Sequence, residues 1–170
     1  MIKEAYIRLP HYEQSASGYC LPACARMILT KMGLTYSELK LSQMLGTDEV
    51  GTPSFAVTNL SQLRLDVDYR IWSTAQLAVT LAHNYPVIAF VQAQFLDHWK
   101  VATSHAVVIV GMEIKQRFWI HDPILPTGPT AVSWDGMLAA WFEFAYHGAT
   151  LQRKKRFSFL DWVRKVVARD

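Results

Sequence analysis

Residues 14–28 read QSASGYCLPACARMI, a polar stretch with a glycine that changes into a strongly apolar, helix-favouring segment. Cys20 stands where the loop meets the predicted helix, and Pro22 supports this placement because proline is favoured in a first helical turn. The first turn offers unpaired backbone N–H groups and the positive end of the helix dipole. Both favour a thiolate over a thiol. Cys20 is therefore a candidate nucleophile rather than a packing residue.

Composition indicates an ordinary globular protein. The 170 residues can bury a substantial core, and with 51% apolar and 18% charged residues the chain is not typical of disordered proteins. The net charge of +3 is too small to favour nucleic acid as a partner. The N-terminus lacks a signal peptide pattern, no apolar run is long enough to span a membrane, and two cysteines make no disulfide framework. We expect a reduced, cytoplasmic protein.

The first half of the chain predicts mainly helices. After a short candidate strand over Ala5–Leu9, a helix over Leu21–Met32 is stopped by Gly33. The spacing of Thr35 and Glu38 is that of a capping box, which opens a helix to about Leu45. The later elements expected here are a helix from Thr52-Pro53 to about Leu63, a strand over Val67–Trp72 and a helix over about Ala75–His83.

The second half predicts strands followed by further helices. Pro86–Ala93, His105–Ile114 and Arg117–His121 are rich in β-favouring residues, and Lys115-Gln116 reads as a tight turn between two antiparallel strands. Helices are expected from Ser133 to about Tyr146 and over Phe157–Val167.

These patterns predict an α+β fold in two packed layers, with an N-terminal helical lobe on a C-terminal antiparallel sheet. We expect one domain over residues 1–170, with a helical part at about 14–83, a sheet at about 86–122 and C-terminal helices at about 133–169.

A cysteine nucleophile needs a base, a group that orients the base, and donors for the oxyanion. His105 opens an apolar strand after a polar stretch, and Asp122 directly follows the neighbouring strand. If these two strands form a hairpin, both side chains lie at the same end of it, and the carboxylate can fix the imidazole tautomer. Gln14 carries an amide six residues before Cys20 that can join its backbone N–H as an oxyanion donor.

Taken together, these residues resemble the C39 peptidases, papain-like cysteine proteases that include the double-glycine leader peptidases. The segments that carry the resemblance are Gln14, Cys20-Leu-Pro-Ala-Cys24, Ser104-His105-Ala106-Val107-Val108 and Asp122-Pro123, within about Gln14–Trp141. The resemblance implies a papain-like fold and hydrolysis of a peptide or protein, with small residues near the cleaved bond. Cys20 would attack, His105 would act as base and then acid, Asp122 would orient His105, and Gln14 would hold the oxyanion. It implies no metal and no organic cofactor.

One departure from the family pattern leaves other functions open. The family usually has Asp-Cys-Gly at the nucleophile, whereas this chain has Tyr19-Cys20-Leu21. Bulk at Leu21 favours a catalytically inactive module that binds peptides. A papain-like deamidase or acyltransferase is a third hypothesis, because the same side chains serve that chemistry.

Three further patterns have structural interpretations. Cys20 and Cys24 lack the common zinc-knuckle spacing, so we expect Cys24 to pack in the core. We interpret Asp97-His98-Trp99 as a structural loop, with a position lining the cleft as the alternative. Strand alternation directs His121 away from Asp122. The basic run Arg153–Arg156 precedes an amphipathic segment that can contact a partner.

Overall fold

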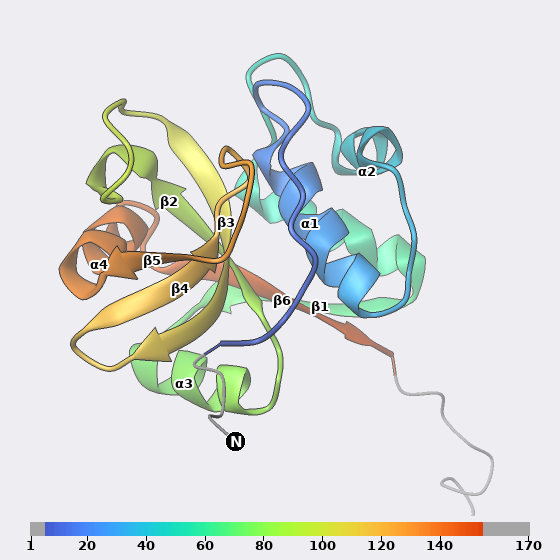
Figure 1. The fold of residues 1–170 in the computed structure, drawn as a ribbon. Coiled ribbons are helices and arrows are strands. Elements are labelled where there is room, and N and C mark those ends of the chain that lie inside the picture. The colour runs from blue at the N-terminus through green and yellow to red at the C-terminus, as the bar shows by residue number, and fades with distance from the viewer. Residues whose placement is uncertain (1–5, 155–170) are drawn as a thin grey trace, which may run out of the picture.

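A six-stranded sheet forms the centre of the protein in the computed structural model, which describes residues 6–154 (Figure 1). The strand order is β1-β6-β2-β3-β4-β5, and each pair of neighbours is antiparallel. The strands are β1 (Leu65–Ile71), β2 (Val87–Gln92), β3 (Ser104–Glu113), β4 (Arg117–His121), β5 (Thr130–Ser133) and β6 (His147–Arg153).

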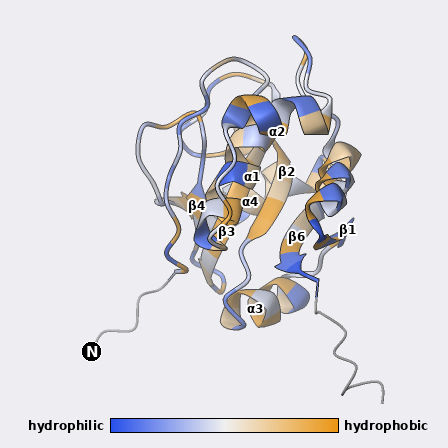
Figure 2. Cartoon of the chain, turned by 90° about the vertical axis from the view of Figure 1, so that its right-hand side faces the viewer, coloured by the Kyte–Doolittle hydropathy of each residue, from blue (hydrophilic) through white to orange (hydrophobic). Residues whose placement is uncertain are grey.

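Helices cover both faces of this sheet. They are α1 (Cys20–Lys31), α2 (Glu38–Leu45), α3 (Thr74–Ala82) and α4 (Trp134–Phe142), with 3₁₀ helices η1 (Ser54–Leu63) and η2 (Ala93–Phe95). In β2, Ile88 and Phe90 join the core beneath α1, α2 and η1, whereas Val87, Ala89 and Val91 join the core beneath α3 and α4. Figure 2 shows the apolar strands of this buried sheet in orange. The predicted α+β class is confirmed, and α3 and α4 add a third layer.

Helix α1 is fixed in register on strand β3. Eight of its twelve residues are buried, and the Cys24 thiol donates a hydrogen bond to the carbonyl oxygen of Ala106, with Sγ and O 3.3 Å apart. Residues four apart lie on the same face of a helix. Cys20, one turn before Cys24, is therefore carried to the end of β3 where His105 lies. The expected packing role of Cys24 agrees with its complete burial.

The hairpin that the sequence predicts is present. β3 and β4 pair directly, with Val108 opposite His121, and Lys115 adopts φ +60° in the turn between them. Among the described residues, no helix is long and apolar enough to cross a membrane.

Strands β5 and β6 were not expected from the sequence. Helix α4 ends at Phe142 rather than Tyr146, and Ala145 and Tyr146 then take positive φ angles of 48° and 58°. That reversal sends the chain back along the sheet, where β6 pairs with both β1 and β2. The expectation of helices throughout about 133–169 is therefore wrong for residues 147–153. The predicted helix Phe157–Val167, and the partner contact proposed for it, lie outside the described residues.

Three smaller expectations are also wrong. Ser37, not Thr35, caps α2 by accepting the backbone N–H of Lys40, and the Glu38 carboxylate is bonded to Ser15. Pro53, and not Thr52, stands at the N-cap of η1, and it provides no side-chain cap. The described residues of the candidate strand Ala5–Leu9 form no strand, although the N–H of Ile7 donates to the carbonyl of Val110.

The close approach of β6 and β2 gives a test of the sheet order. A Cβ atom at Gly148 would lie 2.7 Å from the backbone oxygen of Ile88, a distance that neither strand can relax easily. We expect Gly148→Ala to lower the free energy of unfolding by about 1–3 kcal/mol. Gln152→Ala, in the same strand at a partly exposed position, should change it by no more than about 0.5 kcal/mol. Equal urea midpoints for the two variants would contradict this packing.

Candidate active site

Cys20 is the first residue of α1, as the sequence predicts within one residue. The preceding Tyr19 provides no side-chain cap, so the first-turn N–H groups are left for other partners. Gly18 has φ +81°, and a Cβ there would lie 3.0 Å from the Cα of Gly51. The loop before Cys20 therefore packs directly on the loop after α2. Glu38 holds the same segment by accepting the Ser15 backbone N–H and hydroxyl.

His105 and Asp122 meet at the end of the β3–β4 hairpin. The Nε2 of His105 lies 2.6 Å from Oδ1 of Asp122, and the side chains are 4% and 0% exposed. Burial by itself lowers the pKa of His105, but the hydrogen bonds with Asp122 and Cys20 outweigh it and raise this pKa from 6.5 to about 9. His105 is therefore held as an imidazolium near neutral pH.

Asp122 accepts four hydrogen bonds although it is fully buried. His105 and the backbone N–H of Ile124 donate to Oδ1, and His98 and the indole of Trp99 donate to Oδ2. Burial raises the pKa of a carboxyl group, but these donors reverse the effect and hold the pKa of Asp122 well below its usual range. The buried carboxylate is therefore ionised near neutral pH.

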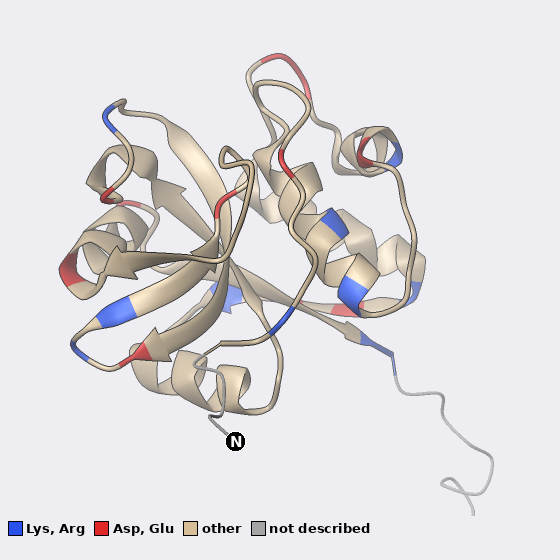
Figure 3. Cartoon of the chain, in the orientation of Figure 1, with Lys and Arg blue, Asp and Glu red and all other residues tan. Residues whose placement is uncertain are grey.

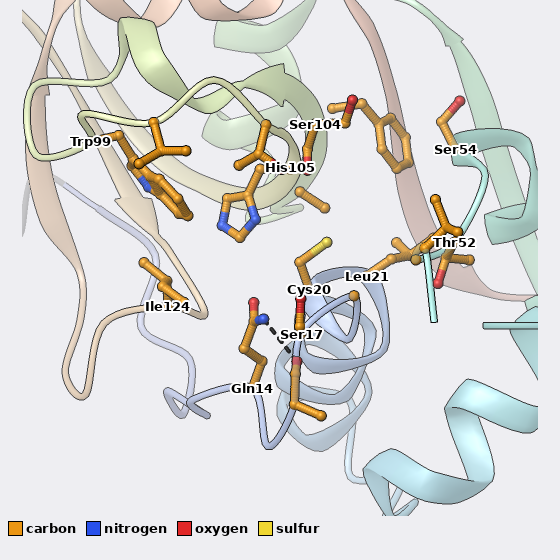
Figure 4. A pocket seen from close by; sticks show the side chains of 18 of the residues that line it. Gln14, Ser17, Cys20, Leu21, Thr52, Ser54, Trp99, Ser104, His105 and Ile124 are labelled. Atoms are coloured by element: carbon orange, nitrogen blue, oxygen red, sulfur yellow. Dashed lines mark hydrogen bonds between the residues drawn. The ribbon is translucent and has the colours of Figure 1, made fainter. Parts of the chain in front are cut away.

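Cys20 and His105 both line a cleft of about 570 Å³ between the helical lobe and the sheet. Figure 4 shows the Cys20 sulfur facing the His105 ring. Since Nε2 of His105 is bonded to Asp122, Nδ1 is the ring nitrogen left for Cys20. Leu21 also lines the cleft, but its side chain is only 1% exposed, so most of it packs in the core.

Gln14 lies in the same cleft, near Cys20 (Figure 4). Its Nε2 donates to the carbonyl oxygen of Ala16 at 2.9 Å, and its Oε1 is buried without a hydrogen-bond partner. The backbone N–H of Gln14 donates to Pro123, directly after Asp122. One of the two Nε2 hydrogens remains for a ligand, because the bond to Ala16 uses only the other.

The structural interpretation of Asp97-His98-Trp99 was incomplete. His98 and Trp99 both bind the carboxylate of Asp122, and the Trp99 ring lies 5.0 Å from the His105 ring, centroid to centroid. The sequence signal was an acidic–His–aromatic triplet in a loop, which alone does not specify its partner. Among residues 6–154, no three His, Cys, Asp or Glu side chains are grouped so that they could hold a metal ion.

A pair of histidines, His11 and His121, lies next to this site. Nδ1 of His11 is 2.9 Å from Nδ1 of His121, and Nε2 of His11 is 2.7 Å from the carbonyl oxygen of Leu125. Because a carbonyl only accepts, His11 carries its proton on Nε2, and the neutral pair then needs His121 to donate from Nδ1. The pair joins the segment before Gln14 to the loop after Asp122.

This pair predicts a pH-dependent stability. Burial, and then the charge of His11, lower the pKa of His121 from 6.5 to about 4, so the unfolded chain takes up this proton first as the pH falls. We expect a loss of roughly 3 kcal/mol in the free energy of unfolding between pH 6.5 and pH 4 from this group. Urea titrations should show a smaller loss in His121→Gln, whereas exposed His83→Gln should behave as wild type. An unchanged pH slope in His121→Gln would exclude the effect.

The fold and the cleft define a class of protein. A helical lobe on an antiparallel sheet, with a thiol at a helix N-terminus facing a histidine on a strand, is the papain-like arrangement of cysteine peptidases. The sequence model of the Peptidase_C39 like family matches residues 6–149, and the chain belongs to this family. No curated protein matches the chain by sequence.

Solved structures show the same fold. A putative C39-like peptidase from Bacillus anthracis superposes with a TM-score of 0.74 at 15% identity, covering 91% of this chain and all of that one. The peptidase domain of Streptococcus ComA, a bi-functional ABC transporter of a quorum sensing pathway, gives 0.66 at 20% identity over 87% and 99% of the chains. A double glycine motif protease from an AMS/PCAT transporter, solved with its leader peptide, gives 0.68 at 13% identity over 90% and 97%.

Proposed function

We propose that this protein is a cysteine peptidase in which Cys20 is the nucleophile, His105 the general base and acid, and Asp122 the group that orients His105. The observation that carries the proposal is the buried His105–Asp122 pair, 2.6 Å apart, in the cleft that also holds Cys20. Family membership and fold support a cysteine peptidase function.

The proposed reaction begins with acylation of Cys20. The Cys20 thiolate forms a bond to the carbonyl carbon of the scissile peptide, and the electron pair of the C=O bond moves to oxygen. The Cys20 backbone N–H and the free Nε2 hydrogen of Gln14 hold this oxyanion, at about 3 kcal/mol per donor. The C–N bond breaks as His105 gives its proton to the leaving amine.

Hydrolysis of the thioester then completes the cycle. His105, now neutral, takes a proton from a water molecule, whose oxygen attacks the acyl carbon. The C–S bond breaks, the peptide leaves as a carboxylic acid, and the thiolate–imidazolium pair is restored. Asp122 stays ionised throughout, because four donors stabilise its negative charge.

A peptide with small residues near the scissile bond is the proposed substrate. The double glycine motif protease was solved with a leader peptide, which supports a peptide as the class of ligand. None of the described residues that line the cleft is Asp, Glu, Lys or Arg, which favours an uncharged segment. Figure 3 shows the charged residues scattered over the lobe and the sheet. The free thiols of Cys20 and Cys24 fit our proposal of a cytoplasmic location.

The ion pair predicts a pH profile for thiol labelling. With the pKa of His105 near 9, the imidazolium is present below that pH and stabilises the thiolate. We expect iodoacetamide to label Cys20 rapidly at pH 6 in wild type, and only at alkaline pH in His105→Ala. Buried Cys24, whose pKa is raised by burial and by the charge of Cys20, serves as the unreactive internal control in the peptide map. Identical profiles in both proteins would favour an inactive peptide-binding module.

Cleavage of a peptide library tests the oxyanion role of Gln14. Gln14→Ala should lower kcat on the order of 10²-fold with little change in KM, because the lost bond forms only in the transition state. Gln43→Ala, at an exposed position of α2, is the matched control. Equal kcat values for Gln14→Ala and wild type would remove Gln14 from the mechanism. Rapid labelling without any peptide cleavage would favour deamidase or acyltransferase chemistry.

A further inference from the structure

The loop between η2 and β3 is anchored by three consecutive side chains. Asp97 accepts the backbone N–H of Ser133 at 2.5 Å and its hydroxyl at 2.6 Å. His98 and Trp99 each donate to Oδ2 of Asp122 at 2.7 Å. The loop is thus tied to the N-cap of α4 on one side and to the buried carboxylate on the other.

His98 differs from Trp99 in what else it can reach. Trp99 lines the cleft and packs on the His105 ring, so substrate can contact it directly. His98 is not among the residues that line the cleft, and its side chain is 23% exposed. Any effect of His98 on the reaction must therefore pass through Asp122.

The two carboxylate oxygens of Asp122 accept hydrogen bonds from different donors. Oδ1 faces His105, and Oδ2 faces His98 and Trp99. Because Asp122 is ionised it only accepts, so Nε2 of His98 carries a hydrogen whatever the state of Nδ1. A carboxylate held at both oxygens cannot rotate about its Cβ–Cγ bond without breaking charge-assisted hydrogen bonds.

We propose that His98 is a positioning residue that fixes the carboxylate plane of Asp122 and so keeps Oδ1 directed at Nε2 of His105. This inference rests on the proposed peptidase function. Without His98, the Trp99 indole is the remaining donor to Oδ2, so the carboxylate is held less firmly and the imidazolium of His105 loses part of its support. Iodoacetamide should then label Cys20 more slowly.

Two substitutions separate hydrogen bonding from packing. His98→Ala removes the donor, and His98→Gln keeps an N–H that can reach the same oxygen. His83→Ala, which removes an exposed imidazole whose Nδ1 is bonded to the carbonyl of Val79, is the matched control. For each protein we would measure iodoacetamide labelling of Cys20 from pH 5 to pH 9, and kcat and KM on the best peptide from the library.

The expected result is a kcat about tenfold lower in His98→Ala, the range for one hydrogen bond to a charged group, with KM unchanged. Labelling at pH 6 should fall by a similar factor, and His98→Gln should restore both quantities to within about threefold of wild type. A merely structural role would lower the urea midpoint without moving the labelling profile of the folded protein.

Three other outcomes would overturn the positioning role of His98. Wild-type labelling and kcat in His98→Ala would overturn the positioning role, as would a His98→Gln variant no better than His98→Ala. If neither variant folds, His98 is a structural residue and the proposal is also overturned. Failure of the peptidase proposal is distinguishable, because wild type itself would then cleave no peptide, whether or not Cys20 is labelled rapidly at pH 6.

Discussion

The buried charge of Asp122 is the constraint on which the site depends. An ionised carboxylate without solvent contact is costly unless donors surround it, and this one has four. Those donors come from the loop before β3, the start of β3 and the turn after β4. The carboxylate therefore joins these segments, and the charge that it keeps is also what holds His105 protonated.

The proposed nucleophile, Cys20, is positioned by a separate set of contacts. The Cys24 thiol fixes the register of α1 on β3, and Glu38 and Gly51 support the loop that leads into Cys20. Helix α2 and the loop after it thus constrain a thiol that must meet a histidine carried by the sheet. Distances across the cleft are set by packing within both halves rather than by the site residues alone.

Local signals predicted those parts of the structure that local chemistry determines. Pro22 and the apolar run after Cys20 marked a helix start, and alternating apolar residues with a turn at Lys115 marked the β3–β4 hairpin. The meeting of His105 with Asp122 followed from that hairpin. The capping-box assignment of Glu38 is wrong, because the same carboxylate also suits a bond to a distant loop, and only the folded chain brings Ser15 near.

Strand β6 was also not predicted, because its partners β1 and β2 are distant from it along the chain. Its position in the sheet has a consequence for synthesis. Residues 147–153 are the link between β1 and β2, so β1 cannot join the sheet until the last strand exists. The pairing of β1 with β6 joins residues more than 75 positions apart, such as Leu65 and Arg153. On a ribosome, the helical lobe and the hairpin can form earlier, but the complete sheet cannot form until residues 147–153 have been synthesised. The sheet of this family member is therefore completed only after β6 has left the exit tunnel.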